Sequence, residues 1–157
     1  MNVYLVQHAE AKSKEVDPER PLSEQGRRDA EQVAALAGRM GIQVSQIRHS
    51  GKLRAEQTAR ILAEALVPAH GVTAVDGLGP VDDVEPVAND LDTTWATLML
   101  VGHLPFMERL IGELVVGDPE EAVVDVQNAA ITCLSRTEEG WQVSWILTPA
   151  MAAATGS

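Results

Sequence analysis

The chain contains very little cysteine, with Cys133 as the one thiol in 157 residues. One thiol excludes an intrachain disulfide, and it fits a protein of a reducing compartment. The residues around Cys133 alternate as in a strand, so we interpret this cysteine as a packing residue. Nothing in this pattern assigns it chemistry.

Basic residues and long apolar runs are also scarce. The chain has 12 Lys and Arg against 23 Asp and Glu, a formal net charge of −11, whereas nucleic-acid binding depends largely on clustered basic side chains. No apolar run approaches the roughly 20 residues of a membrane span, and the amino terminus lacks the pattern of a signal peptide. We therefore expect a soluble, cytoplasmic protein with no nucleic-acid and no membrane partner.

The length and composition are those of one globular domain. A chain of 157 residues can bury one core, and 45% hydrophobic with 22% charged residues is ordinary for a globular protein. We expect a single domain over residues 1–149. The small residues that follow predict a flexible tail over residues 150–157.

The stretch that organises the chain lies at the amino terminus. Residues 3–6 are apolar, rich in β-branched and aromatic side chains and too short for a helix, which is typical of a strand buried on both faces. His8 follows where that strand ends. Ligands of open α/β sheets bind beyond the carboxyl ends of the strands, so His8 is well placed for chemistry. A structural, hydrogen-bonded histidine is the alternative at this point.

Strand and helix patterns alternate through the rest of the chain. Ser23 and Ser50 are predicted to cap the first two helices. Residues 130–134 and 141–147 flank a turn and predict an antiparallel hairpin. The other expected strands are 44–49, 72–75 and 97–101, and the expected helices are 23–40, 50–66, 84–91 and 106–115. The fold class is therefore α/β, a three-layer α/β/α sandwich with a mostly parallel central sheet and a C-terminal hairpin.

Three polar residues fall at the carboxyl ends of three predicted strands. They are His8, Arg54 in the first turn of the second helix, and His103 between a strand and a helix. Phosphoryl transfer needs a nucleophile in line with phosphorus and fixed donors around the equatorial oxygens. A neutral imidazole is a suitable nucleophile, and a guanidinium with a second imidazole can hold the oxygens.

Four segments of the chain resemble the histidine phosphatase superfamily, and within it the short phosphohistidine phosphatases of the SixA type. They are Val6-Gln7-His8-Ala9-Glu10-Ala11, Arg20-Pro21-Leu22-Ser23-Glu24-Gln25-Gly26, Leu53-Arg54-Ala55-Glu56-Gln57-Thr58 and Val101-Gly102-His103-Leu104-Pro105. The resemblance implies a covalent phosphohistidine intermediate without metal or cofactor. His8 would be the nucleophile, and Arg54 and His103 would bind the phosphoryl oxygens. Gln7, Glu10 and Arg20 are the further residues expected to contact the substrate.

The chain departs from the family pattern at two places. The family's first strand ends in Arg-His-Gly, but here Gln7 replaces the arginine, and a neutral hydrogen bond is about half as strong as a charge-assisted one. Arg20 is our candidate for compensation; the alternative is a surface charge paired with Glu19 or Asp17. The second departure is in the loop after the third strand, where many members carry an acidic proton donor and this chain has Gly77.

The missing acid favours phosphohistidine as the substrate, because a P–N bond depends less on an acid for its leaving group than an alkyl ester does. The expected partner is a phosphohistidine-bearing protein such as a phosphotransfer domain, and the short chain has no room for the cap of larger members. One alternative is a phosphatase for small phosphomonoesters with Asp76 or Asp82 as the acid. Another is a module that binds phosphate or a phosphoprotein without turnover.

A metal site built from His8, Glu10 and His103 is disfavoured, because phosphoryl transfer by this set of residues needs no metal. His49 and His70 are interpreted as structural, although His49 ends the second strand and could line the pocket.

Overall fold

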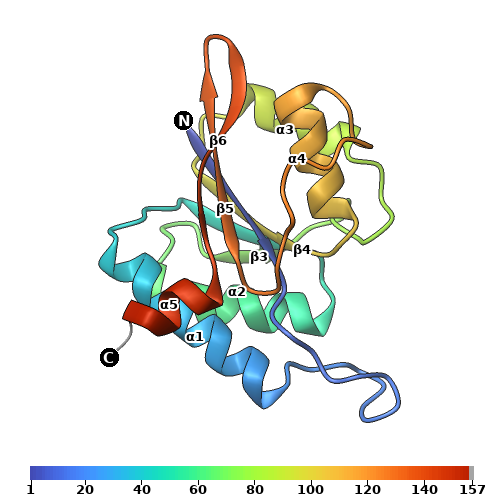
Figure 1. Ribbon diagram of the computed structural model, residues 1–157, viewed down its shortest axis with the longest axis vertical. Helices are drawn as coiled ribbons and strands as arrows, with labels where there is room; N and C mark the ends of the chain where they lie inside the picture. Colours follow the sequence, from blue (N-terminus) through green and yellow to red (C-terminus); the bar gives the residue numbers. More distant parts are fainter. Residues whose placement is uncertain (156–157) are drawn as a thin grey trace.

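The chain forms a six-stranded mixed sheet between two layers of helices, as the computed structural model of residues 1–155 shows (Figure 1). The strands are β1 (Asn2–Gln7), β2 (Gln46–His49), β3 (Val72–Ala74), β4 (Leu98–Gly102), β5 (Ile131–Thr137) and β6 (Gly140–Leu147). The helices are α1 (Glu24–Arg39), α2 (Leu53–Leu66), α3 (Glu85–Thr93), α4 (Phe106–Val116) and α5 (Pro149–Thr155). None of these helices has the length and apolar character that crossing a membrane requires.

The strands lie in the order β3-β2-β4-β1-β5-β6. β1 pairs in parallel with β4, and β2 is parallel to both β4 and β3. β5 pairs antiparallel with β1, and β6 completes a hairpin with β5. The predicted α/β/α sandwich, with its mostly parallel sheet and C-terminal antiparallel hairpin, is therefore confirmed.

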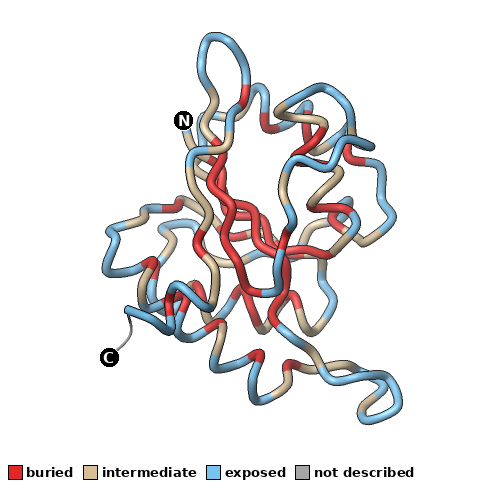
Figure 2. Tube along the Cα trace, in the orientation of Figure 1, coloured by how far each residue is buried: buried red, intermediate tan, exposed pale blue. Residues whose placement is uncertain are grey.

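Alternate residues of the central strands contribute to two separate cores. Tyr4 and Val6 of β1 face α1, α2 and α5, whereas Val3 and Leu5 face α3 and α4. All four side chains are at most 6% exposed, and Figure 2 shows buried residues running through the middle of the sheet. Burial of each such side chain contributes about 1.5–3 kcal/mol. β1 is therefore a fixed platform for whatever follows it.

The two central parallel strands end side by side. Gln7 lies opposite Gly102 in the β1–β4 register, and the backbone N–H of His8 donates to the Gly102 carbonyl at 2.9 Å. His103 is the next residue after Gly102. The register alone therefore brings His8 and His103 to the same edge of the sheet.

α1 begins in close contact with the segment that follows β1. The Ser23 side chain accepts a hydrogen bond from the backbone N–H of Gly26 at 3.0 Å, which confirms the predicted cap. The Ser23 backbone N–H donates to the Glu10 carbonyl at 3.0 Å. A Cβ on Gly26 would lie 2.0 Å from that same carbonyl oxygen. Glycine is required here because any side chain would push the helix away from residues 8–10.

Gly26→Ala should lower the free energy of unfolding by about 2 kcal/mol or more, because the added methyl group overlaps the Glu10 backbone. Gly38→Ala on the same helix is the matched control. There the new Cβ would lie 3.5 Å from the nearest atom, and alanine is the better helix former by up to about 1 kcal/mol. Urea unfolding of both variants measures the difference, and similar midpoints would contradict the proposed close contact.

The start of α2 differs from the prediction. Ser50 is expected to cap this helix, but α2 begins at Leu53, with Lys52 at the cap position and no side-chain hydrogen bond there. Gly51, with φ of 91°, turns the chain between Ser50 and the helix. The Ser50 hydroxyl is instead 2.6 Å from Nε2 of His103.

The C-terminal segment also differs from the prediction of a flexible tail over residues 150–157. Residues Pro149–Thr155 form α5, which packs against α1 and buries Ala152 at 1% exposure. A run of alanines is a strong helix former, and the apolar surface of α1 gives it a partner. Residues 156 and 157 of the expected tail lie outside the described part of the chain.

Candidate active site

His8, Arg54 and His103 lie just beyond the carboxyl ends of three neighbouring parallel strands. His8 follows β1, His103 follows β4, and Arg54 lies in the first turn of the helix that follows β2. Because β4 pairs with both β1 and β2, the three residues share one edge of the sheet. The rings of His8 and His103 are 5.1 Å apart, centroid to centroid. The structure therefore brings together the three residues that the sequence predicted.

The imidazole of His8 is fixed in one tautomer. Its Nδ1 lies 2.7 Å from the carbonyl oxygen of Ala9, and a carbonyl only accepts, so Nδ1 carries the proton. The pKa of His8 is lowered to about 4, chiefly by burial and also by the charges of Arg54 and Arg20. At neutral pH His8 is therefore uncharged, with an unprotonated Nε2. This is the state that a nucleophilic imidazole requires.

His103 is more deeply buried, at 2% exposure. Burial is the main cause that lowers its pKa to about 3, and the charges of His8, Arg54, Lys52 and Arg20 act in the same direction. Its Nδ1 is buried and has no hydrogen-bond partner within residues 1–155. A buried polar atom without a partner is rare in folded proteins, so the His103 Nδ1 calls for a partner that residues 1–155 do not supply.

Arg54 and Arg20 surround the histidines with positive charge. The Nε of Arg54 is buried and unpaired within the described residues, and burial together with the Arg20 charge lowers the pKa of Arg54. The Nε of Arg20 donates to the Lys12 carbonyl at 3.0 Å. No ion pair joins Arg20 to Glu19 or Asp17 in the part of the chain described. The charge of Arg20 lowers the pKa of His8, His103 and Arg54, so Arg20 acts on the site.

Two other predicted site residues differ in their surroundings. Gln7 is 8% exposed, and its Oε1 is buried without a partner among residues 1–155. The carboxylate of Glu10 accepts a hydrogen bond from the Ser23 hydroxyl at 2.7 Å. Glu10 is therefore held at the start of α1, where a negative charge is favourable. Gln7 stays beside His8, with its amide available for a hydrogen bond.

The acidic loop after β3 uses its carboxylates locally. Asp82 accepts from a backbone N–H three residues earlier at 2.7 Å, and Asp83 from a backbone N–H two residues later at 3.0 Å. Within residues 1–155, no carboxylate hydrogen-bonds to His8, Arg54 or His103. The site is therefore rich in donors and poor in acids.

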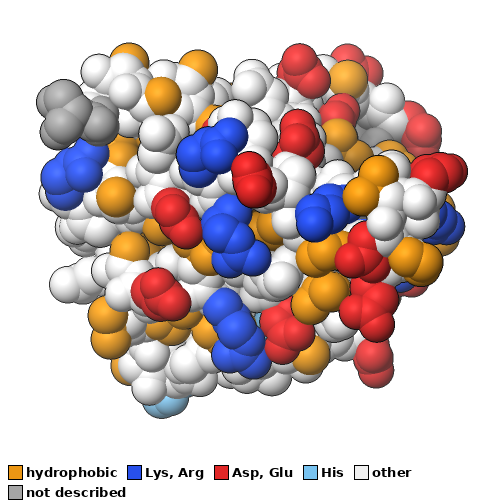
Figure 3. Space-filling view, turned by 90° about the horizontal axis from the view of Figure 1, so that it is seen from below, with side chains coloured by type: hydrophobic (Ala, Val, Ile, Leu, Met, Phe, Trp, Pro, Cys, Tyr) orange, Lys and Arg blue, Asp and Glu red, His pale blue; other side chains and the backbone are white. Residues whose placement is uncertain are grey.

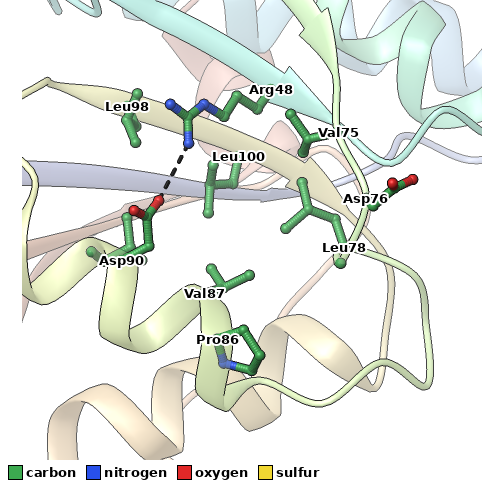
Figure 4. A pocket seen from close by; sticks show the side chains of 11 residues that line it. Arg48, Val75, Asp76, Leu78, Pro86, Val87, Asp90, Leu98 and Leu100 are labelled. Carbon is green, nitrogen blue, oxygen red and sulfur yellow. Dashed lines mark hydrogen bonds and ion pairs between the residues drawn. The ribbon is translucent and has the colours of Figure 1, made fainter.

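Asp76 lines a cavity separate from the His8 site, shown in Figure 4. This cavity, of about 250 Å³, lies between β2, β4 and α3, and the Arg48–Asp90 ion pair of 3.5 Å forms part of its lining. Its wall is mostly apolar, formed by Val75, Leu78, Pro86, Val87, Leu91, Leu98 and Leu100. The carboxylate of Asp76 is turned away from the ion pair. None of the three central site residues lines this cavity.

Three residues that the sequence analysis did not assign hold the site in place. Thr58, fully buried, accepts from the Ala9 backbone N–H at 2.9 Å and donates to the Arg54 carbonyl at 2.8 Å. Gln57 accepts from a backbone N–H of the loop before α1 at 2.8 Å, and Asn128 donates to the His8 carbonyl at 2.9 Å. Thr58 and Gln57 lie in a motif that the sequence analysis quoted. Asn128 had no signal in the sequence.

His49 has a structural contact, as expected. It is 3% exposed, and its Nδ1 accepts a hydrogen bond from the backbone N–H of Gly51 at 3.0 Å. The ring therefore shapes the turn that carries Ser50.

The stability of the fold should fall as the pH is lowered from 6.5 toward 4. An unfolded histidine binds a proton below about pH 6.5, but folded His8 and His103 remain neutral down to about pH 4 and 3. The unfolded state then binds more protons, so the free energy of unfolding falls by at most about 1.4 kcal/mol per pH unit for each histidine. Urea unfolding at pH 7 and pH 5 measures the loss. His8→Gln should reduce this loss of unfolding free energy. An equal loss in His8→Gln and in the wild type would contradict the lowered pKa of His8.

Lys and Arg side chains lie among Asp and Glu on the face that Figure 3 shows from below. Within the described residues, no group of three or more His, Cys, Asp or Glu is placed to hold a metal ion. The donors around His8 suit a small tetrahedral anion such as phosphate.

Known proteins share both the sequence pattern and the fold. The sequence model of the histidine phosphatase superfamily (branch 1) matches residues 3–78. Phosphohistidine phosphatase SixA of Escherichia coli (strain K12) is 26% identical over 152 residues, 92% of this chain and 94% of that protein. A structure of protein histidine phosphatase SixA complexed with tungstate superposes with a TM-score of 0.83 at 24% identity, covering 96% of this chain and 98% of that one.

The same fold also occurs in a phosphatase with a different named substrate. A phosphoserine phosphatase mutant from Entamoeba histolytica, solved with phosphoserine, has a TM-score of 0.74 at 14% identity and covers 96% of this chain and 98% of that one. At these identities the two solved structures show the fold and leave the substrate open.

The fold, the edge that carries His8 and the matching motifs define the class as a phosphatase-type α/β domain. The chain is similar to the histidine phosphatase superfamily over residues 3–78, and to SixA over most of its length. The resemblance found in the sequence is confirmed at this level.

Proposed function

We propose that this protein is a phosphohistidine phosphatase that removes the phosphoryl group from a histidine of a partner protein, with His8 as the nucleophile. The observation that supports this most is the state of His8. Its Nδ1 donates to a backbone carbonyl, so its unprotonated Nε2 is available for attack. Buried donors of Arg54 and His103 lie at the same edge of the sheet. The similarity to SixA points to the same reaction.

The proposed reaction has two steps. In the first, Nε2 of His8 attacks phosphorus, the P–N bond of the substrate breaks, and the leaving imidazole nitrogen takes a proton from water. In the second, a water molecule attacks phosphorus, the bond to His8 Nε2 breaks, and the proton that the attacking water loses neutralises the hydroxide left by the first step. The products are the free histidine of the partner, inorganic phosphate and His8 in its starting state. Such covalent catalysis replaces one difficult step by two easier ones.

The donors are proposed to act on the equatorial oxygens. Arg54 offers a guanidinium fork, His103 offers Nδ1, and Arg20 supplies the second positive charge that Gln7 does not. Gln7 contributes only its neutral amide. In this proposal Glu10 acts indirectly, because its bond to Ser23 orders the segment after His8.

Within residues 1–155 no carboxylate hydrogen-bonds to His8, Arg54 or His103, which favours phosphohistidine over an alkyl phosphate. An alkoxide is a poor leaving group and gains much from a general acid, whereas an imidazole nitrogen depends on one less. The phosphohistidine of a phosphotransfer domain, exposed on a protein surface, suits a short chain without a cap over the site. We place this activity in signal transduction in the cytoplasm, where Cys133 would remain reduced.

Comparing two substrates tests the proposal. The wild-type protein is incubated with a phosphotransfer domain labelled on histidine and, separately, with phosphoserine. We expect loss of label much faster than the substrate's own hydrolysis and little release of phosphate from phosphoserine. Faster turnover of phosphoserine would instead support a phosphatase for small phosphomonoesters.

A binding module without turnover is the second candidate, and Gln7 is the observation that favours it. With a neutral amide in place of an arginine, the site has one charge-assisted donor fewer for the transition state. Tight binding of tungstate without any loss of label from the phosphotransfer domain would establish this candidate and overturn the phosphatase.

A further inference from the structure

Ser50 makes a contact that neither its sequence position nor the proposed reaction explains. Its Oγ is 2.6 Å from Nε2 of His103, and it also accepts a hydrogen bond from the Lys52 backbone N–H at 3.3 Å. Ser50 stands three residues before α2, in a turn shaped by Gly51 and His49. The Lys52 backbone N–H therefore fixes the position of the Ser50 Oγ.

The direction of the Ser50–His103 hydrogen bond follows from counting donors and acceptors. Suppose first that Nε2 carries the proton and donates to Ser50. The hydroxyl hydrogen of Ser50 would then have no acceptor within residues 1–155, and Nδ1 of His103 would carry a buried lone pair without a donor. If Ser50 donates to Nε2, the hydroxyl is satisfied and Nδ1 carries the ring proton. Only the second arrangement leaves a donor on His103 for an anion.

We propose that Ser50 is a positioning residue for His103: its hydroxyl donates to Nε2 and holds the ring as the Nδ1–H tautomer, so that Nδ1 donates to a phosphoryl oxygen. This role rests on the proposed function only in one respect, that the oxygen which accepts from Nδ1 belongs to a phosphoryl group. The tautomer itself is a property of the free protein. In water a neutral imidazole is free to exchange its tautomers, so a fixed partner is needed to keep the donor on Nδ1.

Nitrogen-15 NMR of the histidine rings tests the tautomer without any substrate. In the wild type at pH 7, His103 should be neutral with its proton on Nδ1. Ser50→Ala should shift His103 toward the Nε2–H form, and Ser50→Thr, which keeps a hydroxyl, should restore the wild-type spectrum. Wild-type His103 protonated on Nε2, or an unchanged spectrum in Ser50→Ala, would overturn the proposal.

Ser45→Ala is the matched control, because it removes another hydroxyl hydrogen bond beside β2. The Ser45 Oγ donates to the Thr97 carbonyl at 2.8 Å, at the end of β2 opposite the site. This variant should leave the His103 spectrum unchanged. A shift as large as that of Ser50→Ala would mean that any loss of packing near β2 disturbs His103, and the proposal would fail.

Tungstate titration measures the consequence for anion binding. Ser50→Ala should weaken tungstate binding about 10-fold, because one donor to the anion is lost from most molecules. Ser50→Thr should bind within about 2-fold of the wild type. If the tautomer and tungstate results are as expected but phosphohistidine is not hydrolysed, the role of Ser50 stands and the phosphatase reaction is the part that fails.

Discussion

His8→Ala should abolish the phosphoenzyme and reduce turnover of a phosphohistidine substrate by on the order of 10⁴-fold or more, because no other side chain at the site offers an unprotonated nitrogen in the same place. Acid-labile, base-stable phosphate on the wild-type protein, trapped by rapid quenching, measures the intermediate. The fold should be kept, since the β1 core does not depend on this ring.

His70→Ala is the control for His8→Ala, because His70 is exposed and lies before β3, away from the edge that carries the site. It should keep full activity and a normal phosphoenzyme. Phosphoenzyme formation at the wild-type level in His8→Ala would show that another group is the nucleophile. An equal loss in both variants would point to a defect of folding instead.

Arg54→Ala should lower kcat by about 10²–10³-fold, the usual loss when one preorganised donor to a developing charge is removed. It should also leave the protein equally stable or slightly more stable. A cation in the first turn of a helix is unfavourable, and the Nε of Arg54 is buried without a partner in the described structure. Loss of activity with gain of stability is expected of a residue kept for function.

Arg60→Ala is the matched control for Arg54→Ala, since Arg60 lies on the same helix but is exposed and paired with Glu56 at 3.1 Å. It should change kcat little. Arg54→Lys should recover only part of the activity, because an ammonium lacks the planar fork of donors. Wild-type kcat in Arg54→Ala would remove this residue from the proposed mechanism.

The fold was predictable because its strongest signals are local. Residues 3–6 of β1 and 98–101 of β4 are apolar without interruption, and only a strand with a helix layer on each side buries both faces of such a run. Parallel strands with helical connections end at one edge, so the proximity of His8 and His103 follows from topology. Arg54 follows from its place at the start of a helix.

The hydrogen bonds of the site were not predictable in the same way. Ser50 satisfies the pattern of a helix cap, but its hydroxyl contacts His103, a residue 53 positions away in the sequence. Asn128 reaches the His8 carbonyl from 120 positions away. Such contacts depend on side-chain directions that tertiary packing sets, and local preference carries no information about them. The same holds for α5, whose partner is a helix far earlier in the chain.

The loop between β1 and α1 is closed at its base by the antiparallel bridge between Ala11 and Leu22, whose two hydrogen bonds run from Lys12 N–H to the Pro21 carbonyl and from Ser23 N–H to the Glu10 carbonyl. The residues beyond this closure, 13–19, form a turn that includes the exposed Val16. Lengthening an exposed turn costs little free energy when its ends are already held together. The length and sequence of this turn can therefore change without moving the backbone of residues 8–10.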